Sequence, residues 1–110
     1  MIQHLTSASD FVDAVLNNEL VLLDIHATWC QPCKRMKPVL AQLSEQMPHV
    51  RFLAVKVDEL DAFNMSSIRA EVNAVPTLMF FRNGKRVDTN YGYIEPEALA
   101  QWINECCGSQ

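Results

Sequence analysis

An apolar run followed closely by two cysteines is the most constraining feature of this sequence. The run extends from Leu20 to Ile25, and the segment Trp29-Cys30-Gln31-Pro32-Cys33 comes shortly after it. A buried strand that leads to the start of a helix and delivers a Cys-X-X-Cys pair there is typical of a thiol redox site. The sequence therefore predicts an α/β unit with reactive thiols where the strand gives way to the helix.

The composition fits one compact domain that spans residues 1–110. Hydrophobic residues make up 49% of the 110 residues, and a chain of this length buries about two-thirds of the surface that its unfolded form exposes. The formal net charge is -4, and lysine and arginine form no longer block than the broken set Lys34, Arg35 and Lys37. A nucleic-acid-binding surface is therefore not expected.

The N-terminal sequence and the cysteine content bear on the compartment. Residues 1–4 contain no basic segment followed by an apolar one, and no apolar stretch approaches the roughly 18 residues of a membrane span. We therefore expect a cytoplasmic protein without membrane contact, with a processed organellar form as the alternative. Four cysteines in such a chain indicate reactive thiols rather than a framework of structural disulfides.

Apolar periodicity predicts alternating strands and helices without a linker or an internal repeat. Two nearly continuous apolar runs predict parallel strands that are buried on both faces, and the dipeptide Asn83-Gly84 predicts an antiparallel hairpin. The expected strands are 20–26, 52–57, 77–81 and 86–91. The first expected helix is capped by Ser7 or Ser9 and directs Phe11, Val12, Val15 and Leu16 toward the sheet. The other expected helices are 33–47, a looser stretch at 62–71, and 95–106.

Several residues in a fixed order resemble the marks of the thioredoxin family over almost the whole chain. These marks are Asp24, Trp29-Cys30-Gln31-Pro32-Cys33-Lys34, Pro38, Val75-Pro76-Thr77, Gly84 and Gly92. The resemblance implies an α/β thioredoxin fold, in which four helices flank a central mixed sheet of about five strands. It also implies a thiol-disulfide oxidoreductase, expected to be monomeric, that carries electrons from an NADPH-dependent thioredoxin reductase to client proteins with disulfides. We expect no bound metal or cofactor beyond a redox-active disulfide between Cys30 and Cys33.

Cys30 is expected to be the nucleophile and Cys33 the resolving cysteine. The N-terminus of a helix stabilises a thiolate through its unpaired N–H groups and its dipole, and Cys30 is predicted to lie at such an end. Cys33 lies one turn further along and is expected to be more shielded, so the order of attack follows from exposure. Cys30 would form a mixed disulfide with the client, and Cys33 would then displace the reduced client. As a structural staple alone, so short a loop would contribute only about 2 kcal/mol.

Asp24 is unusual because it interrupts an otherwise apolar strand. Burial disfavours the charged form of a carboxylate, so a buried Asp24 is suited to exchange a proton. The resemblance supports the hypothesis that Asp24 accepts the proton of Cys33 when Cys33 attacks the mixed disulfide. The alternative is a solvated aspartate at the end of a strand.

Pro76 is expected to follow a cis peptide bond that faces the two thiols, as the resemblance implies. In that arrangement the backbone of Val75 pairs with an extended client segment. Uncharged contact surface around the thiols would come from Trp29, Gln31, Pro32, Gly92 and Ile94. The alternative is an ordinary proline at the start of a strand, since only about 5–6% of X-Pro bonds are cis.

Three positions depart from the family pattern. Gln31 stands where a glycine is usual between the cysteines, which adds a side chain beside the client groove. His26 stands where an aromatic residue is common, and it is either a packed neutral histidine or an extra titrating group near the thiols. The lysine that usually accompanies the buried carboxylate has no secure counterpart. Ala54 aligns with it, whereas Lys56 lies nearby in the sequence and is expected to point elsewhere.

Cys106 and Cys107 lie at the end of the last predicted helix. The simpler interpretation is a pair of solvent-exposed thiols, and the alternative is an intermolecular disulfide that links two copies of the chain.

Three other functions remain open for the chain. It could be a disulfide isomerase or a specialised electron donor, which differ from a reductase in reduction potential. A metal-binding module would need further ligands besides Cys30 and Cys33, and His4, His26 and His49 do not show a usual zinc spacing. A non-catalytic scaffold with the same fold would have no need for both thiols together with Asp24 and Pro76.

Overall fold

The computed structural model describes residues 1–108. Its elements in chain order are β1 (Ile2–His4), α1 (Ala8–Asn17), β2 (Leu20–His26), α2 (Gln31–Gln46), β3 (Arg51–Lys56), α3 (Val57–Ala62), α4 (Ser66–Arg69), β4 (Thr77–Arg82), β5 (Lys85–Tyr91) and α5 (Pro96–Cys106). The described residues thus form five strands and five helices. The helix count exceeds the expected four because α4 lies within the expected stretch 62–71, whereas α3 begins at Val57, which was expected in the preceding strand, and was not predicted.

The strands form one mixed sheet in the order β1-β3-β2-β4-β5. Strand β3 pairs in parallel with both β1 and β2, while β4 pairs antiparallel with β2 and β5. The predicted parallel centre and the predicted hairpin are therefore both confirmed. The sheet confirms the α/β fold class with five strands in mixed pairing.

The hairpin between β4 and β5 turns where the sequence predicts. Asn83 has φ 55 and Gly84 has φ 80, and two consecutive positive φ values are what a two-residue hairpin turn requires. Asparagine and glycine adopt this conformation at the lowest cost among the amino acids.

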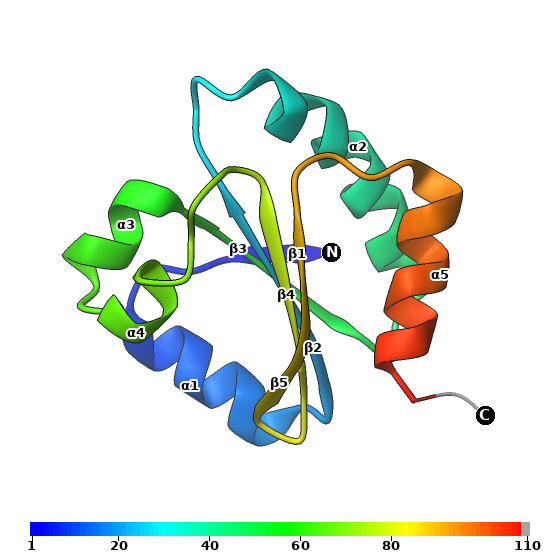
Figure 1. Ribbon diagram of the computed structural model, residues 1–110. Coiled ribbons are helices and arrows are strands. Elements are labelled where there is room, and N and C mark those ends of the chain that lie inside the picture. The colour runs from blue at the N-terminus through cyan, green and yellow to red at the C-terminus, as the bar shows by residue number, and fades with distance from the viewer. Residues whose placement is uncertain (109–110) are drawn as a thin grey trace.

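Helices cover both faces of the sheet (Figure 1), with α1, α3 and α4 on one side and α2 and α5 on the other. Side chains of β2 alternate between the two layers. Val21, Leu23 and Ile25 belong to the apolar cluster on the α1 side, whereas Leu22 belongs to the cluster with α2 and α5. Since Asp24 follows Leu22 by two residues, the same alternation directs Asp24 toward the α2 side of the sheet.

The first helix begins as predicted but packs through a narrower stripe. The N–H of Asp10 donates to Oγ of Ser7 at 3.3 Å, which identifies Ser7 as the N-cap. Val12 and Leu16 are 47% and 75% exposed, so their expected contact with the sheet is wrong. The other two expected residues, Phe11 and Val15, do make that contact, together with Ala14.

Strand β1 was not expected from the sequence. Its three residues add to the edge of the sheet by pairing with β3. Among residues 1–108, none of the helices is both long enough and apolar enough to cross a membrane.

Candidate active site

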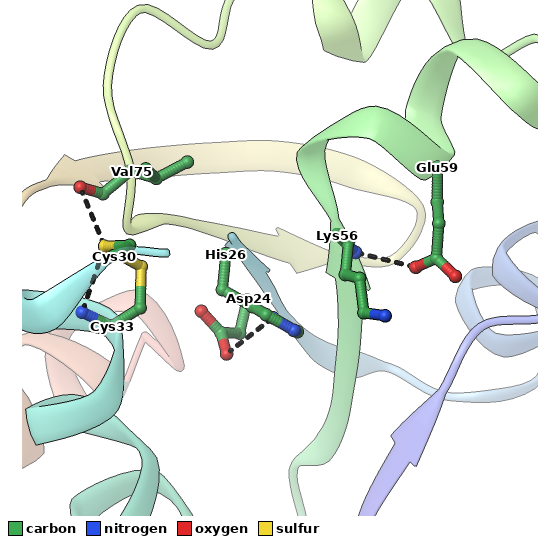
Figure 2. Close-up of polar contacts among 7 residues, drawn as sticks. All are labelled: Asp24, His26, Cys30, Cys33, Lys56, Glu59 and Val75. Atoms are coloured by element: carbon green, nitrogen blue, oxygen red, sulfur yellow. Dashed lines mark hydrogen bonds and ion pairs between the residues drawn. A yellow bond between two sulfur atoms is a disulfide. The ribbon is translucent and has the colours of Figure 1, made fainter. Parts of the chain in front are cut away.

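Cys30 and Cys33 form a disulfide at the N-terminus of α2, with their Cα atoms 5.3 Å apart. Cys30 is the N-cap residue and has an extended backbone, and the helix begins at Gln31. Pro32 follows in the first turn, where the missing N–H of proline costs no helical hydrogen bond. The N–H of Cys33 donates to Sγ of Cys30 at 3.1 Å (Figure 2). The helix start thus directs a backbone donor at the sulfur of the expected nucleophile.

Exposure does not distinguish the two cysteines as expected. Cys30 is 4% exposed and Cys33 is 8% exposed, so the predicted difference is wrong for the disulfide form. The two sulfurs differ in their surroundings instead. Cys30 lies beside Val75, whereas Cys33 lines a cavity between the sheet and α2.

The peptide bond between Val75 and Pro76 is cis, which confirms the isomer that the resemblance implied. Sγ of Cys30 lies 3.6 Å from the carbonyl oxygen of Val75. The N–H of Gly92 donates to the carbonyl oxygen of Pro76 at 2.8 Å, and Gly92 has φ 84. The disulfide, the cis-proline loop and the segment after β5 therefore meet at one place.

The expected client-contact residues differ in exposure. Trp29 is 75% exposed, Gln31 and Pro32 are also exposed, and Val75 and Gly92 are half-buried. Ile94 is half-buried and packs against the apolar cluster beneath α2 and α5. Trp29, Gln31 and Pro32 consequently form an exposed and uncharged rim on the chain that carries the disulfide.

A cavity of about 470 Å³ lies between the sheet and α2, and both Asp24 and Cys33 line it. The Asp24 side chain is only 14% exposed, so of the two interpretations of Asp24 the buried one is correct. Its Oδ1 atom is buried and has no hydrogen-bond partner among the atoms of residues 1–108. The sheet and α2 therefore bring a buried carboxylate to the same cavity as the expected resolving cysteine.

His26 lines this cavity as well. Its Nδ1 atom lies 3.6 Å from Oδ2 of Asp24, and its side chain is 20% exposed. The ring also makes an edge-on contact with the ring of His4, with centroids 6.1 Å apart. His26 is therefore largely packed, and it shares the cavity with Cys33.

Lys56 lies on the same face of the sheet as Asp24, although the sequence predicted that it points elsewhere. In the parallel register, Asp24 pairs with Ala54 and His26 pairs with Lys56, so Ala54 and Lys56 project to the same face of the sheet. Lys56 lines the cavity together with Lys34 and Lys37 of α2. The prediction that Lys56 points elsewhere is therefore wrong, although the ion pairs found within residues 1–108 do not join it to Asp24.

The simpler interpretation of Cys106 and Cys107 is also wrong. Cys106 is 7% exposed and belongs to the apolar cluster between the sheet and helices α2 and α5, and Cys107 is half-buried against that cluster. Burial raises the pKa of the Cys106 thiol to about 12, with smaller contributions from the nearby Asp88 and Cys107. Burial also raises the pKa of Cys107.

Potential metal ligands are dispersed in this structure. Within residues 1–108, no three His, Cys, Asp or Glu side chains come close enough together to hold a metal ion.

Comparisons with known proteins agree with this geometry. The family model described as Thioredoxin matches residues 2–105. Thioredoxin-1 of Saccharomyces cerevisiae is 40% identical over 103 residues, which cover 94% of this chain and 96% of the yeast protein. Thioredoxin H-type 1 of Nicotiana tabacum is 42% identical over 93 residues, which cover 84% of this chain and 71% of the tobacco protein.

Two solved structures extend the similarity to three dimensions. A poplar wild-type thioredoxin h has a TM-score of 0.83 at 33% identity, with 99% of this chain and 98% of the poplar chain covered. The oxidised thioredoxin of Plasmodium falciparum has a TM-score of 0.81 at 33% identity, with 96% and 97% covered. With the Cys-X-X-Cys disulfide at the start of α2, these matches lead to one conclusion. The chain belongs to the thioredoxin family of thiol-disulfide oxidoreductases.

Proposed function

We propose that the protein reduces disulfides of client proteins, with Cys30 as the nucleophile and Cys33 as the resolving cysteine. The observation that carries the proposal is the different setting of the two sulfurs. Sγ of Cys30 accepts a hydrogen bond from the N–H of Cys33 and lies beside the Val75 carbonyl, whereas Cys33 shares a cavity with Asp24. This setting suits a Cys30 thiolate that attacks the client disulfide and a Cys33 thiol that gives its proton to Asp24.

The reaction proceeds in two exchanges. The Cys30 thiolate attacks one sulfur of the client disulfide, the client S–S bond breaks, and the other client sulfur leaves as a thiolate. Cys33 then gives its proton to Asp24 and attacks Sγ of Cys30, and the second client thiolate leaves and takes a proton from water. Two electrons pass to the client, and the Cys30–Cys33 disulfide remains.

The rim beside the disulfide is proposed as the client-binding surface. Trp29 supplies a large exposed ring, and Gln31 and Pro32 add uncharged surface next to Cys30. The backbone of Val75 pairs with an extended client segment in the manner of an added strand, and Gly92 borders the cis-proline loop through its hydrogen bond to Pro76.

The thioredoxin family works with a thioredoxin reductase and disulfide-containing clients. We infer that this chain accepts electrons from an NADPH-dependent thioredoxin reductase and acts as a monomeric domain without a bound cofactor. A cytoplasmic location is proposed because a reducing compartment keeps Cys30 and Cys33 in the dithiol form and also keeps Cys106 and Cys107 reduced. Cell fractionation with an antibody against the chain tests the location.

A turnover assay tests the proposed function. Insulin is the disulfide substrate, NADPH and thioredoxin reductase supply electrons, and the wild type is compared with Cys30→Ser and Cys33→Ser. We expect turnover only from the wild type. A folded wild type that fails with the reductase but turns over with dithiothreitol would favour a specialised electron donor. A measured reduction potential separates a reductase from an isomerase, since about 30 mV corresponds to about 1.4 kcal/mol for this two-electron couple.

A further inference from the structure

Two buried polar atoms near the proposed resolving cysteine lack hydrogen-bond partners within residues 1–108. They are Oδ1 of Asp24 and Nδ1 of His26. Buried polar groups in folded proteins are nearly always paired with protein groups or with water, so both atoms are available to a proton donor or acceptor in the cavity that they line. Here both unpaired atoms come from β2, two residues apart and on the same face of the sheet.

The geometry allows a proton to pass between these two side chains. Oδ2 of Asp24 lies 3.6 Å from Nδ1 of His26, which is longer than a hydrogen bond, so proton transfer requires the two side chains to move closer together. In the view of Figure 2, the Asp24 carboxylate lies between the disulfide and the His26 ring. Asp24, His26 and Cys33 all line the same cavity.

His26 also lies nearer to solvent than Asp24. Its side chain is 20% exposed against 14% for Asp24, and its ring contacts that of His4, which is exposed. A neutral imidazole can accept a proton at one nitrogen and release one from the other. His26 therefore combines a nitrogen that faces the carboxylate with a ring that reaches toward water.

We propose that His26 relays the proton between Asp24 and solvent during the resolving step. The inference rests on the proposed role of Asp24 as the proton acceptor of Cys33. Protonated Asp24 gives its proton to Nδ1 of His26, and the Nε2–H bond of His26 releases a proton to water. The ring then returns to its first tautomer by exchange with water. No electrons move in the relay. Because the proton leaves Asp24 while Cys33 attacks Cys30, the rate of the resolving step itself depends on the relay. His26 thus acts as a positioning residue, because it reaches the reacting sulfur only through Asp24.

Charges of both signs line the cavity around His26. The groups that line it with His26 are His4 from β1, Asp24 from β2, Lys56 from β3, and Cys33, Lys34 and Lys37 from α2. The three ammonium groups oppose a positive charge in the cavity, whereas the Asp24 carboxylate, 3.6 Å from Nδ1 of His26, favours one.

The test uses His26→Asn and His26→Ala, with His49→Asn as the matched control. Asparagine keeps a polar group near Asp24 but cannot accept a proton on one atom and release one from another. Alanine leaves room for free imidazole in the cavity. His49 is exposed and does not line the cavity. The measured quantity is the single-turnover rate at which Cys33 resolves a mixed disulfide on Cys30, followed by stopped-flow fluorescence between about pH 5 and pH 8.

We expect both His26 variants to resolve the mixed disulfide about tenfold more slowly, which is less than the 10²–10⁴-fold effect of a direct general base. Added imidazole should restore the rate of His26→Ala but leave His49→Asn and Asp24→Asn unchanged. A wild-type rate in His26→Ala, or a slow rate that imidazole does not restore, overturns the relay.

Asp24→Asn separates failure of the relay from failure of the proposed function. A slow Asp24→Asn together with His26 variants at the wild-type rate rejects only the relay. An Asp24→Asn variant at the wild-type rate across the pH range rejects the role of Asp24, and the relay with it. Urea unfolding of each variant establishes that the compared proteins are folded.

Discussion

The backbone N–H of Cys33 donates a hydrogen bond of 3.1 Å to Sγ of Cys30. One cysteine thereby caps the helix that carries the other, and the donor stabilises negative charge on Sγ of Cys30 when the disulfide is reduced. Both residues are buried in the disulfide form. The proposed order of attack consequently depends on this hydrogen bond and on the contact of Cys30 with Val75, and exposure plays no part in it.

The capping bond leads to a prediction about stability. Serine is a strong N-cap residue and alanine is a poor one. The free energy of unfolding of Cys30→Ser should therefore exceed that of Cys30→Ala by about 1 kcal/mol, while neither variant reduces a disulfide. Urea unfolding of both variants, with dithiothreitol present, measures the difference. Equal stabilities would show that Cys30 does not cap α2.

The unpaired carboxylate of Asp24 should lower the stability of the fold. Since Oδ1 is buried without a partner, Asp24→Ala should raise the free energy of unfolding by about 1–3 kcal/mol at neutral pH. Asp13→Ala on the exposed side of α1 is the control and should change stability by less than about 0.5 kcal/mol. A loss of stability in Asp24→Ala would mean that the carboxylate is well solvated in the cavity.

Gly92 is required for its backbone conformation. Its φ of 84 lies in the left-handed region, and an added Cβ would meet no atom within 4 Å. Gly92→Ala should therefore cost only the backbone term, about 1–2 kcal/mol. Thermal unfolding measures this cost, and Gly92→Asn should retain more stability because asparagine tolerates this conformation. Equal losses in the two variants would contradict the backbone explanation.

Buried Cys106 should make the protein sensitive to alkaline pH. Its pKa is about 12 in the fold against 9.0 for an ordinary thiol. Between these values the unfolded chain loses the thiol proton while the folded chain keeps it, so the stability falls as the pH rises from about 9 to about 12. Urea unfolding across this range should show a smaller fall for Cys106→Val than for the wild type. Parallel curves would reject the assignment to Cys106.

The same burial bears on dimer formation. Burial raises the pKa of both thiols, so the difference in exposure decides which of them an oxidant or a second chain reaches. We expect any disulfide-linked dimer under peroxide to form through half-buried Cys107, so Cys107→Ser should reduce the dimer content and Cys106→Ser should not. Non-reducing gel electrophoresis measures the dimer, and the opposite pattern would place the linkage at Cys106.

Much of the fold follows from strong local signals in the sequence. The continuous apolar runs predict β2 and β3, and Asn83-Gly84 predicts the hairpin, because each signal determines local geometry without help from distant residues. Strand β1 has only three residues, which is too short for a period to show. Helix α3 begins directly after β3. No glycine or proline separates the two elements, so the sequence does not show where the strand ends and the helix begins.

The site was harder to predict where it depends on pairing between strands. The role of Cys30 and Cys33 stays a prediction, but their disulfide and the cis bond before Pro76 are confirmed. The place of Lys56 requires the register between β2 and β3, which sequence alone does not give. The pairing of Asp24 with His26 could have been inferred, since residues two apart on a strand share a face.

The most direct test of the account identifies the cysteine that holds the client. Cys33→Ser and Cys30→Ser are each incubated in reduced form with a disulfide-containing client, and mass spectrometry of the peptides locates the mixed disulfide. The account predicts that Cys33→Ser accumulates a stable adduct at Cys30, whereas Cys30→Ser accumulates little adduct at Cys33. A stable adduct at Cys33 in Cys30→Ser, with none at Cys30 in Cys33→Ser, would reverse the order of attack and contradict the proposed mechanism.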